Sequence, residues 1–366
     1  MSVVETQYFA LLRAALWGTP VIVDAPFEWD AVMKVAQHHN NDVLLSDVAA
    51  RMTSGERPSQ AILDKMQLSM RNGLLHQMRQ RQILVSAVKL LREHDIEPVL
   101  LKGFGLALLY PNPSLRQFGD IDLFVGLDHF HEACSLLRTL PGGYNWGEEK
   151  DIGRHYNIEF GRYPMEVHRV SADIDDAKEN ALFEAIEREG LLQRQQHVDL
   201  DGFPITLPSK EFQVFFTFFH AWHHFLTTGV GWRQLTDVAL ALHAYHNQLD
   251  LEQLQRWLTS MRLMQPWQTF GWLMVDRLGL PETEMPFYNA SSRRRAQRLY
   301  RQIMEEGNFK RANNFKRKQP KHRLWHKLHA FLSIFADFFY RVRVFPAIAF
   351  REMGSAFRYA LKKQKK

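Results

Sequence analysis

The chain has 366 residues, 46% of them hydrophobic, which is enough to bury the cores of two ordinary domains. A single cysteine, Cys134, excludes an internal disulfide and is typical of a reducing compartment. The most apolar window, 328–350, is interrupted by three charged residues, so it is no spanning helix, and the N-terminus lacks a signal-peptide pattern. These features predict a cytoplasmic protein without stabilising disulfides.

The first 94 residues are predicted to form a helical region. Apolar residues recur at helical spacing over 8–16 and again over 62–91, where one long amphipathic helix is expected. The period then changes from 3.6 to 2 at 95–101, which predicts a strand, and a short helix over 104–110 and a loop over 111–114 follow. A second strand is expected over 120–125.

The next elements complete a predicted catalytic core over 95–207. A helix is expected over 128–140, then strands over 155–160 and 165–170 with a turn at 162–164 between them. From 208 to 308 the pattern is again helical, and 309–366 is a basic linker and amphipathic tail. The predicted class is therefore α+β, with a mixed sheet core, an N-terminal helical region and a C-terminal helical domain.

Two aspartates stand inside the apolar run GDIDLFV. Residues two apart in a strand share a face, so Asp120 and Asp122 should point the same way while Ile121 and Leu123 cover the other face. Two ionised carboxylates in a half-buried site repel each other, and Mg²⁺ or Mn²⁺ would compensate them. Glu166 in MEVHRV is the predicted third ligand if its strand lies beside theirs. A pair of solvated acids at the end of a strand is the alternative.

With this ordered set, the chain resembles the DNA polymerase β-like nucleotidyltransferase superfamily, and more narrowly a little-characterised bacterial nucleotidyltransferase family. The run LLKGFGLALLYPNPSLRQFGDIDLFV together with MEVHRV carries the resemblance. It implies transfer of a nucleoside monophosphate from an NTP, such as ATP, to a hydroxyl acceptor with release of pyrophosphate. It also implies that Asp120, Asp122 and Glu166 are catalytic metal ligands.

The resemblance places Gly103 where the backbone approaches the triphosphate, although the usual Gly-Ser pair is replaced by Lys102-Gly103-Phe104-Gly105. Gly103 and Gly105 precede a helix whose free N–H groups would attract phosphate, and Lys102 would add a charge. Arg116 is a second candidate for a phosphate contact. For Lys102 and Arg116 the alternatives are a pairing with a core acid and a surface position.

Several histidines are further candidates. His168 shares the predicted face of Glu166 and would either orient it, reach the metal site or be a structural histidine. His220, His223 and His224 suggest zinc only weakly, because HExxH is absent, and they could line the acceptor cleft. Asp237, a polar residue on an apolar face, would hold Arg233 or one of these histidines.

Two other functions remain open at this stage. A glycosyltransferase also uses Asp-x-Asp to hold a metal diphosphate. In such enzymes the Asp-x-Asp normally follows a nucleotide-binding α/β half of the domain, whereas the first 95 residues here are helical. A non-catalytic nucleotide-binding or membrane-associated adaptor is the second. The tail from 310 onward has 16 Lys and Arg against two acids, so it could bind an anionic membrane, including the inner face of the cell membrane, or RNA, or pack on the body.

Overall fold

The computed structural model of the chain describes residues 1–52, 56–145, 153–172, 174, 176–307, 338–339 and 341–350. Its centre is one mixed sheet of seven strands in the order β3-β4-β5-β2-β1-β7-β6. The strands are β1 (Val99–Leu100), β2 (Ile121–Phe124), β3 (Gly143–Asn145), β4 (His155–Phe160), β5 (Tyr163–His168), β6 (Gln196–Asp199) and β7 (Pro204–Leu207). The predicted α+β class is confirmed.

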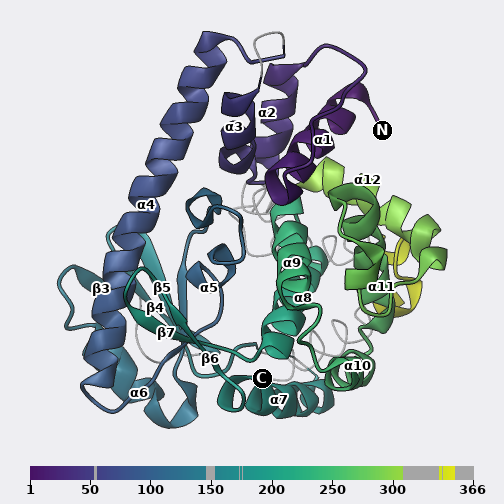
Figure 1. Cartoon of the computed structure of the whole chain (residues 1–366). Coiled ribbons are helices and arrows are strands. Elements are labelled where there is room, and N and C mark those ends of the chain that lie inside the picture. The colour runs from purple at the N-terminus through teal and green to yellow at the C-terminus, as the bar shows by residue number, and fades with distance from the viewer. Residues whose placement is uncertain are drawn as a thin grey trace, which may run out of the picture.

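Helices surround this sheet on both sides (Figure 1). The longer helices are α1 (Val3–Trp17), α2 (Trp29–His38), α3 (Asp42–Arg51), α4 (Gln60–Arg92), α6 (Gly126–Leu137), α7 (Ala177–Leu192), α8 (Lys210–Thr227), α9 (Trp232–Tyr245), α10 (Leu251–Ser260), α11 (Met264–Leu273) and α12 (Arg293–Glu306). The short ones are α5 (Phe104–Ala107), the 3₁₀ turns Pro113–Leu115, Glu282–Glu284 and Ala290–Ser292, and a π-helical turn, Met274–Leu278.

The alternation along the strands decides which helices cover each face of the sheet. Ile121 and Leu123 of β2, with Met165 and Val167 of β5, belong to a core cluster that includes apolar residues of α4 and α6. The residues between them point the opposite way, toward the layer that contains α8 and α9. Phe124 accordingly belongs to the other core cluster, together with residues of those two helices. The site described below lies on this second face.

The N-terminal helices α1–α3 and the C-terminal helices share a single hydrophobic core. Phe9 of α1, for example, packs edge-on against Trp232 of α9, and the two ring centroids are 4.7 Å apart. In Figure 1 the first helices lie against α12 at the top of the molecule, while α4 runs down its outer side toward α6. The predicted boundaries at 94/95 and 207/208 fall between α4 and β1 and between β7 and α8. The division into domains stays a prediction.

A few elements of the structure differ from the prediction. Strand β3, the hairpin β6–β7 and helix α7 were not predicted, and the expected turn at 162–164 is wrong because Tyr163 and Pro164 already belong to β5. Pro164 is tolerated there because β5 pairs with β2 only from Met165 onward, so no ladder hydrogen bond on that side needs its missing N–H.

One part of the tail packs on the body. Phe345 is buried between Trp222 and Phe225 of α8, with ring centroids 5.0 and 5.7 Å away. The predicted linker, 310–323, and the final KKQKK lie outside the described residues, so a membrane or RNA partner stays a prediction. Within the described ranges, no helix is both long and apolar enough to cross a bilayer.

Candidate functional site

The three predicted carboxylates meet on the face of the sheet that looks toward α8. Strands β2 and β5 are parallel neighbours, and their register sets Asp122 directly beside Glu166. Asp120 precedes β2 by one residue and shares the face of Asp122. One ligand oxygen from each of the three residues lies within 4.8 Å of the others. The strand pairing on which the sequence prediction depended is therefore present.

Asp122 is the buried centre of this cluster. Its side chain is fully buried, and Oδ1 is 3.1 Å from Lys102 Nζ and 3.0 Å from His168 Nε2. Burial alone would raise the pKa of Asp122, but Lys102 and His168 outweigh it and hold the pKa well below its usual value. Asp122 is therefore ionised at neutral pH.

Asp120 has the opposite electrostatic balance. Repulsion from Asp122, together with burial, raises the pKa of Asp120. The described residues give it no hydrogen bond or ion pair of its own. A second carboxylate held beside an ionised one without a partner is a strained arrangement that an added cation would relieve.

Two histidines flank Glu166, and only His168 lies within hydrogen-bonding distance of it. His168 Nε2 lies 3.3 Å from Glu166 Oε2 as well as beside Asp122, and His155, opposite His168 in the β4–β5 ladder, has Nε2 3.8 Å from Glu166 Oε1. Arg154 Nε donates to His155 Nδ1, which leaves the hydrogen of a neutral His155 ring on Nε2. Although His155, Glu166 and His168 are close enough to ligate one ion, these hydrogens indicate that the rings orient carboxylates.

The donor set fits a hard divalent cation. All three residues offer carboxylate oxygens, which Mg²⁺ and Mn²⁺ prefer. Asp122 Oδ2 is buried and has no hydrogen-bond partner among the described residues, although its twin Oδ1 has two. A buried carboxylate oxygen without a donor is costly unless something else binds it. We take Asp122 Oδ2 as the oxygen that a cation would use.

Among the predicted phosphate contacts, Lys102 and Gly103 lie at the site. Lys102 is bound to Asp122, and burial, which would lower its pKa, is outweighed by the three carboxylates, which raise it. Gly103 has φ 61°, which favours glycine, and a Cβ there would lie 3.6 Å from the carbonyl oxygen of Asp120. The turn Lys102-Gly103 thus passes directly beside the aspartates.

Gly105 and Arg116 have structural roles. A Cβ on Gly105 would come within 2.7 Å of Leu207, so this glycine allows α5 to pack on β7. Arg116 is buried, bonds both carboxylate oxygens of Asp237 at 2.7 and 2.9 Å, and donates to the carbonyl of Gly103 at 3.0 Å. Helix α5 has only four residues, so its dipole is small. These contacts give Gly105 and Arg116 structural roles, and a phosphate contact by either residue stays a prediction.

Asp237 also differs from its prediction. It holds Arg116, and it accepts a hydrogen bond from the hydroxyl of Tyr110 at 2.8 Å, rather than pairing with Arg233 or a histidine. Asp237 of α9 holds Arg116, and Arg116 in turn donates to the carbonyl of Gly103. Helix α9 thereby helps to position Gly103.

Helices α8 and α9 bring three polar side chains toward the carboxylates. His220 and His224 of α8 have their Nε2 atoms 2.9 Å apart. Burial, then Lys102, lowers the pKa of both rings, that of His224 to about 3, so both are neutral at physiological pH. The positive charge of Arg233, in α9, also lowers the pKa of these two histidines. A role in lining the acceptor cleft was predicted for the histidines, and none for Arg233.

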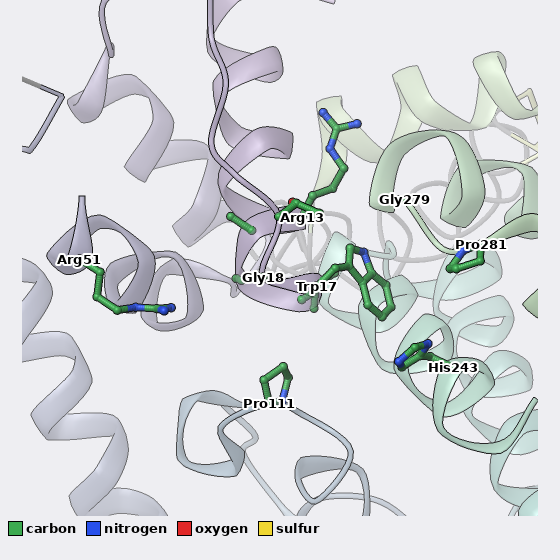
Figure 2. Close-up of a pocket in the computed structure, with 12 residues that line it drawn as sticks. Arg13, Trp17, Gly18, Arg51, Pro111, His243, Gly279 and Pro281 are labelled. Atoms are coloured by element: carbon green, nitrogen blue, oxygen red, sulfur yellow. The ribbon is translucent and has the colours of Figure 1, made fainter. Parts of the chain in front are cut away.

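A cavity of about 570 Å³ opens elsewhere, between the end of α1, the loop at Pro111 and the turn at Gly279. In Figure 2, Trp17 stands in its middle, with His243 and Pro281 on one side and Arg51 on the other. His243 bonds Glu284, Arg51 bonds Asp47, and none of the lining residues belongs to the carboxylate cluster. The candidate site is thus distinguished by its cluster of carboxylates and does not coincide with this cavity.

Comparisons with known proteins give the family. Two solved structures are similar over part of the chain, each at 14% identity and a TM-score of 0.36. They are the antibiotic-resistance factor ANT(2'')-Ia, matching 50% of this chain and 91% of its own, and an antigenic nucleotidyltransferase-like protein from Paracoccidioides brasiliensis, matching 58% and 95%. A comparison with curated proteins found no match. The family model described as an uncharacterised nucleotidyltransferase matches residues 25–279, more than two thirds of the chain, and the chain belongs to that family.

Proposed function

We propose that this chain transfers a nucleoside monophosphate from an NTP to a hydroxyl acceptor and releases pyrophosphate, in a reaction that depends on Mg²⁺ or Mn²⁺. The single observation that carries the proposal is the cluster of Asp120, Asp122 and Glu166, whose ligand oxygens lie within 4.8 Å of one another. Family membership supports nucleotidyl transfer as the reaction class.

Each residue has a part in this reaction. Asp120, Asp122 and Glu166 hold the divalent cation, which when bound supplies charge for the phosphates and lowers the pKa of the attacking hydroxyl. The acceptor oxygen bonds to the α-phosphorus while the bond to the bridging oxygen of the leaving pyrophosphate breaks. Glu166, part-exposed and oriented by His168, is assigned the hydroxyl proton. Lys102 stabilises Asp122 before and during the reaction.

The test uses each α-labelled NTP with Mg²⁺ or Mn²⁺ and a cell extract as the source of acceptor. Wild type should move the label onto a product, and Asp120→Asn should reduce this by about 100-fold or more, because the ligand charge is lost. Asp128→Asn, an exposed aspartate at the start of α6, is the matched control. Full activity in Asp120→Asn would refute the assignment.

The same assay separates the other two functions. A glycosyltransferase leaves the α-phosphate label on the nucleotide, whereas a nucleotidyltransferase moves it onto the acceptor. An adaptor would bind NTP in the presence of the cation without releasing pyrophosphate. The complete set of three carboxylates favours catalysis over an adaptor.

A further inference from the structure

Arg233 is a cation of the site whose hydrogen-bonding capacity is largely unused. It lies in the first turn of α9, and its Nη1 donates to the carbonyl of Gln117 at 2.8 Å. Its Nε is buried and has no hydrogen-bond partner among the described residues. A buried N–H without an acceptor is costly, so such a group at a site indicates a missing acceptor.

The surroundings of this guanidinium include the segment that carries the aspartates. Gln117, the hydrogen-bond partner that Arg233 has in the described part of the chain, precedes Asp120 by three residues, and Asp120 is among the charged groups near Arg233. On the other side Arg233 acts on His220 and His224. Arg233 is thus near the buried Arg116–Asp237 pair and within electrostatic range of both Asp120 and the histidines of α8.

The neighbouring arginine cannot take this role. Asp237 neutralises Arg116 with two hydrogen bonds, whereas no ion pair with Arg233 is found in the described part of the chain. Lys102 is bound to Asp122. Among the described residues no carboxylate binds Arg233 directly, and arginine presents several N–H groups in the planar arrangement that matches phosphate oxygens.

We propose that Arg233 binds the β- and γ-phosphates of the NTP, and after the reaction the leaving pyrophosphate, through Nε and Nη2. This inference rests on the proposed function. Nη1 keeps its hydrogen bond to the carbonyl of Gln117. One nitrogen of the guanidinium therefore holds the side chain in place, and the other two bind phosphate. Arg233 is a substrate-binding residue in the position that sequence reading gave to Arg116.

The experiment measures dissociation constants for the four common NTPs, the matching NMPs and inorganic pyrophosphate, all with Mg²⁺. Arg233→Ala should weaken the binding of NTP and pyrophosphate about 10- to 100-fold, the range for one lost charged hydrogen-bonding group, while NMP binding changes less than about threefold. Arg233→Lys, which keeps the charge, should restore part of the loss. Arg81→Ala is the control, since Arg81 also donates to backbone carbonyls, those of Leu200 and Asp201.

Each outcome decides the question. A parallel loss for NTP and NMP in Arg233→Ala, or none, would overturn the role of Arg233 while leaving nucleotidyl transfer intact. If the wild-type protein binds neither NTP nor pyrophosphate, the proposed function and this inference fail together. A folding defect in Arg233→Ala would be visible in the far-UV circular dichroism spectrum. It would weaken NTP and NMP binding alike.

Discussion

Asp120 and Asp122 lie on the same face and two residues apart, yet their environments are opposite. Asp122 has Lys102 and His168 as partners and its pKa is lowered, whereas the pKa of Asp120 is raised, chiefly by Asp122. The two carboxylates are thus unequal in the absence of a cation. Asp122 contributes to the fold through its partners, and Asp120 is retained at an energetic cost.

This difference predicts a gain of stability in Asp120→Asn. The substitution removes the repulsion, so the free energy of unfolding without divalent cations should rise by up to about 1 kcal/mol, as is common when functional strain is removed. Asp122→Asn should instead lose stability, because Lys102 would stay buried without its partner. Urea unfolding in EDTA measures both. A destabilised Asp120→Asn would contradict the account of the site.

The buried pair of Asp237 and Arg116 predicts a dependence on pH. Burial would raise the pKa of Asp237, but Arg116 outweighs it and the native pKa is lowered. A lowered native pKa gives stability that is present above the unfolded value of about 3.9 and is lost as the pH falls through the native one. Asp237→Asn should lower the free energy of unfolding by about 3 kcal/mol at pH 7. The difference in free energy of unfolding between this variant and wild type should become smaller below pH 4.

Urea unfolding at pH 7, 4 and 3 tests this dependence. Asp47→Asn is the control, because the Asp47–Arg51 pair is exposed and should contribute less than about 1 kcal/mol. A gap between wild type and Asp237→Asn that stays constant with pH would show that ionisation of Asp237 is not what stabilises the fold.

At this scale the sequence predicted the carboxylates well and the arginines poorly. The period of two placed Asp120 with Asp122 on one face and Glu166 with His168 on another strand's face, and the fold had to supply the pairing of β2 with β5. The partner of Arg116 is 121 residues away in sequence, which no local pattern could indicate. The carboxylates follow from spacing within a strand, whereas the role of an arginine follows from long-range contacts.

Among the elements, the hairpin β6–β7 has a local sequence signal although it was not predicted. Asp201-Gly202 joins the two strands, and both residues have positive φ, 50° and 84°. Asp-Gly between alternating runs is a strong hairpin signal, because type I′ turns need positive φ at both positions. Strand β3 and helix α7 carried weaker signals, while the long periodic helix over 62–91 was predicted almost to its ends as α4.

Two glycines in these elements should respond oppositely to alanine. Gly202→Ala places a side chain at φ 84° and should cost about 1 kcal/mol. Gly73 lies inside α4, where a Cβ would make only ordinary contacts at 3.8 Å or more, so Gly73→Ala should stabilise by about 0.5–1 kcal/mol. Thermal unfolding of both variants measures the difference. Equal effects would mean that backbone conformation does not decide them.

At the scale of the whole molecule, the tail segment 341–350 is expected to be part of the folded core. Phe345 is 1% exposed and contacts two aromatic rings of α8. Phe345→Ala should cost about 3 kcal/mol, as for other buried phenylalanines. Phe350→Ala, more than half exposed, is the control and should cost less than about 1 kcal/mol. Equal unfolding midpoints for the two variants would show that this segment is only loosely attached.

The bond from Arg116 to Asp237 joins the segment that leads into β2 to a helix of the opposite layer. A hinge movement of that helical layer away from the sheet would separate Arg116 from Asp237 and leave both buried charges unpaired, at a cost of several kcal/mol. This buried pair therefore opposes an outward movement of α9 away from the segment that leads into β2. We expect turnover without a rate-limiting closure, and any adjustment on loading should be confined to side chains such as Arg233.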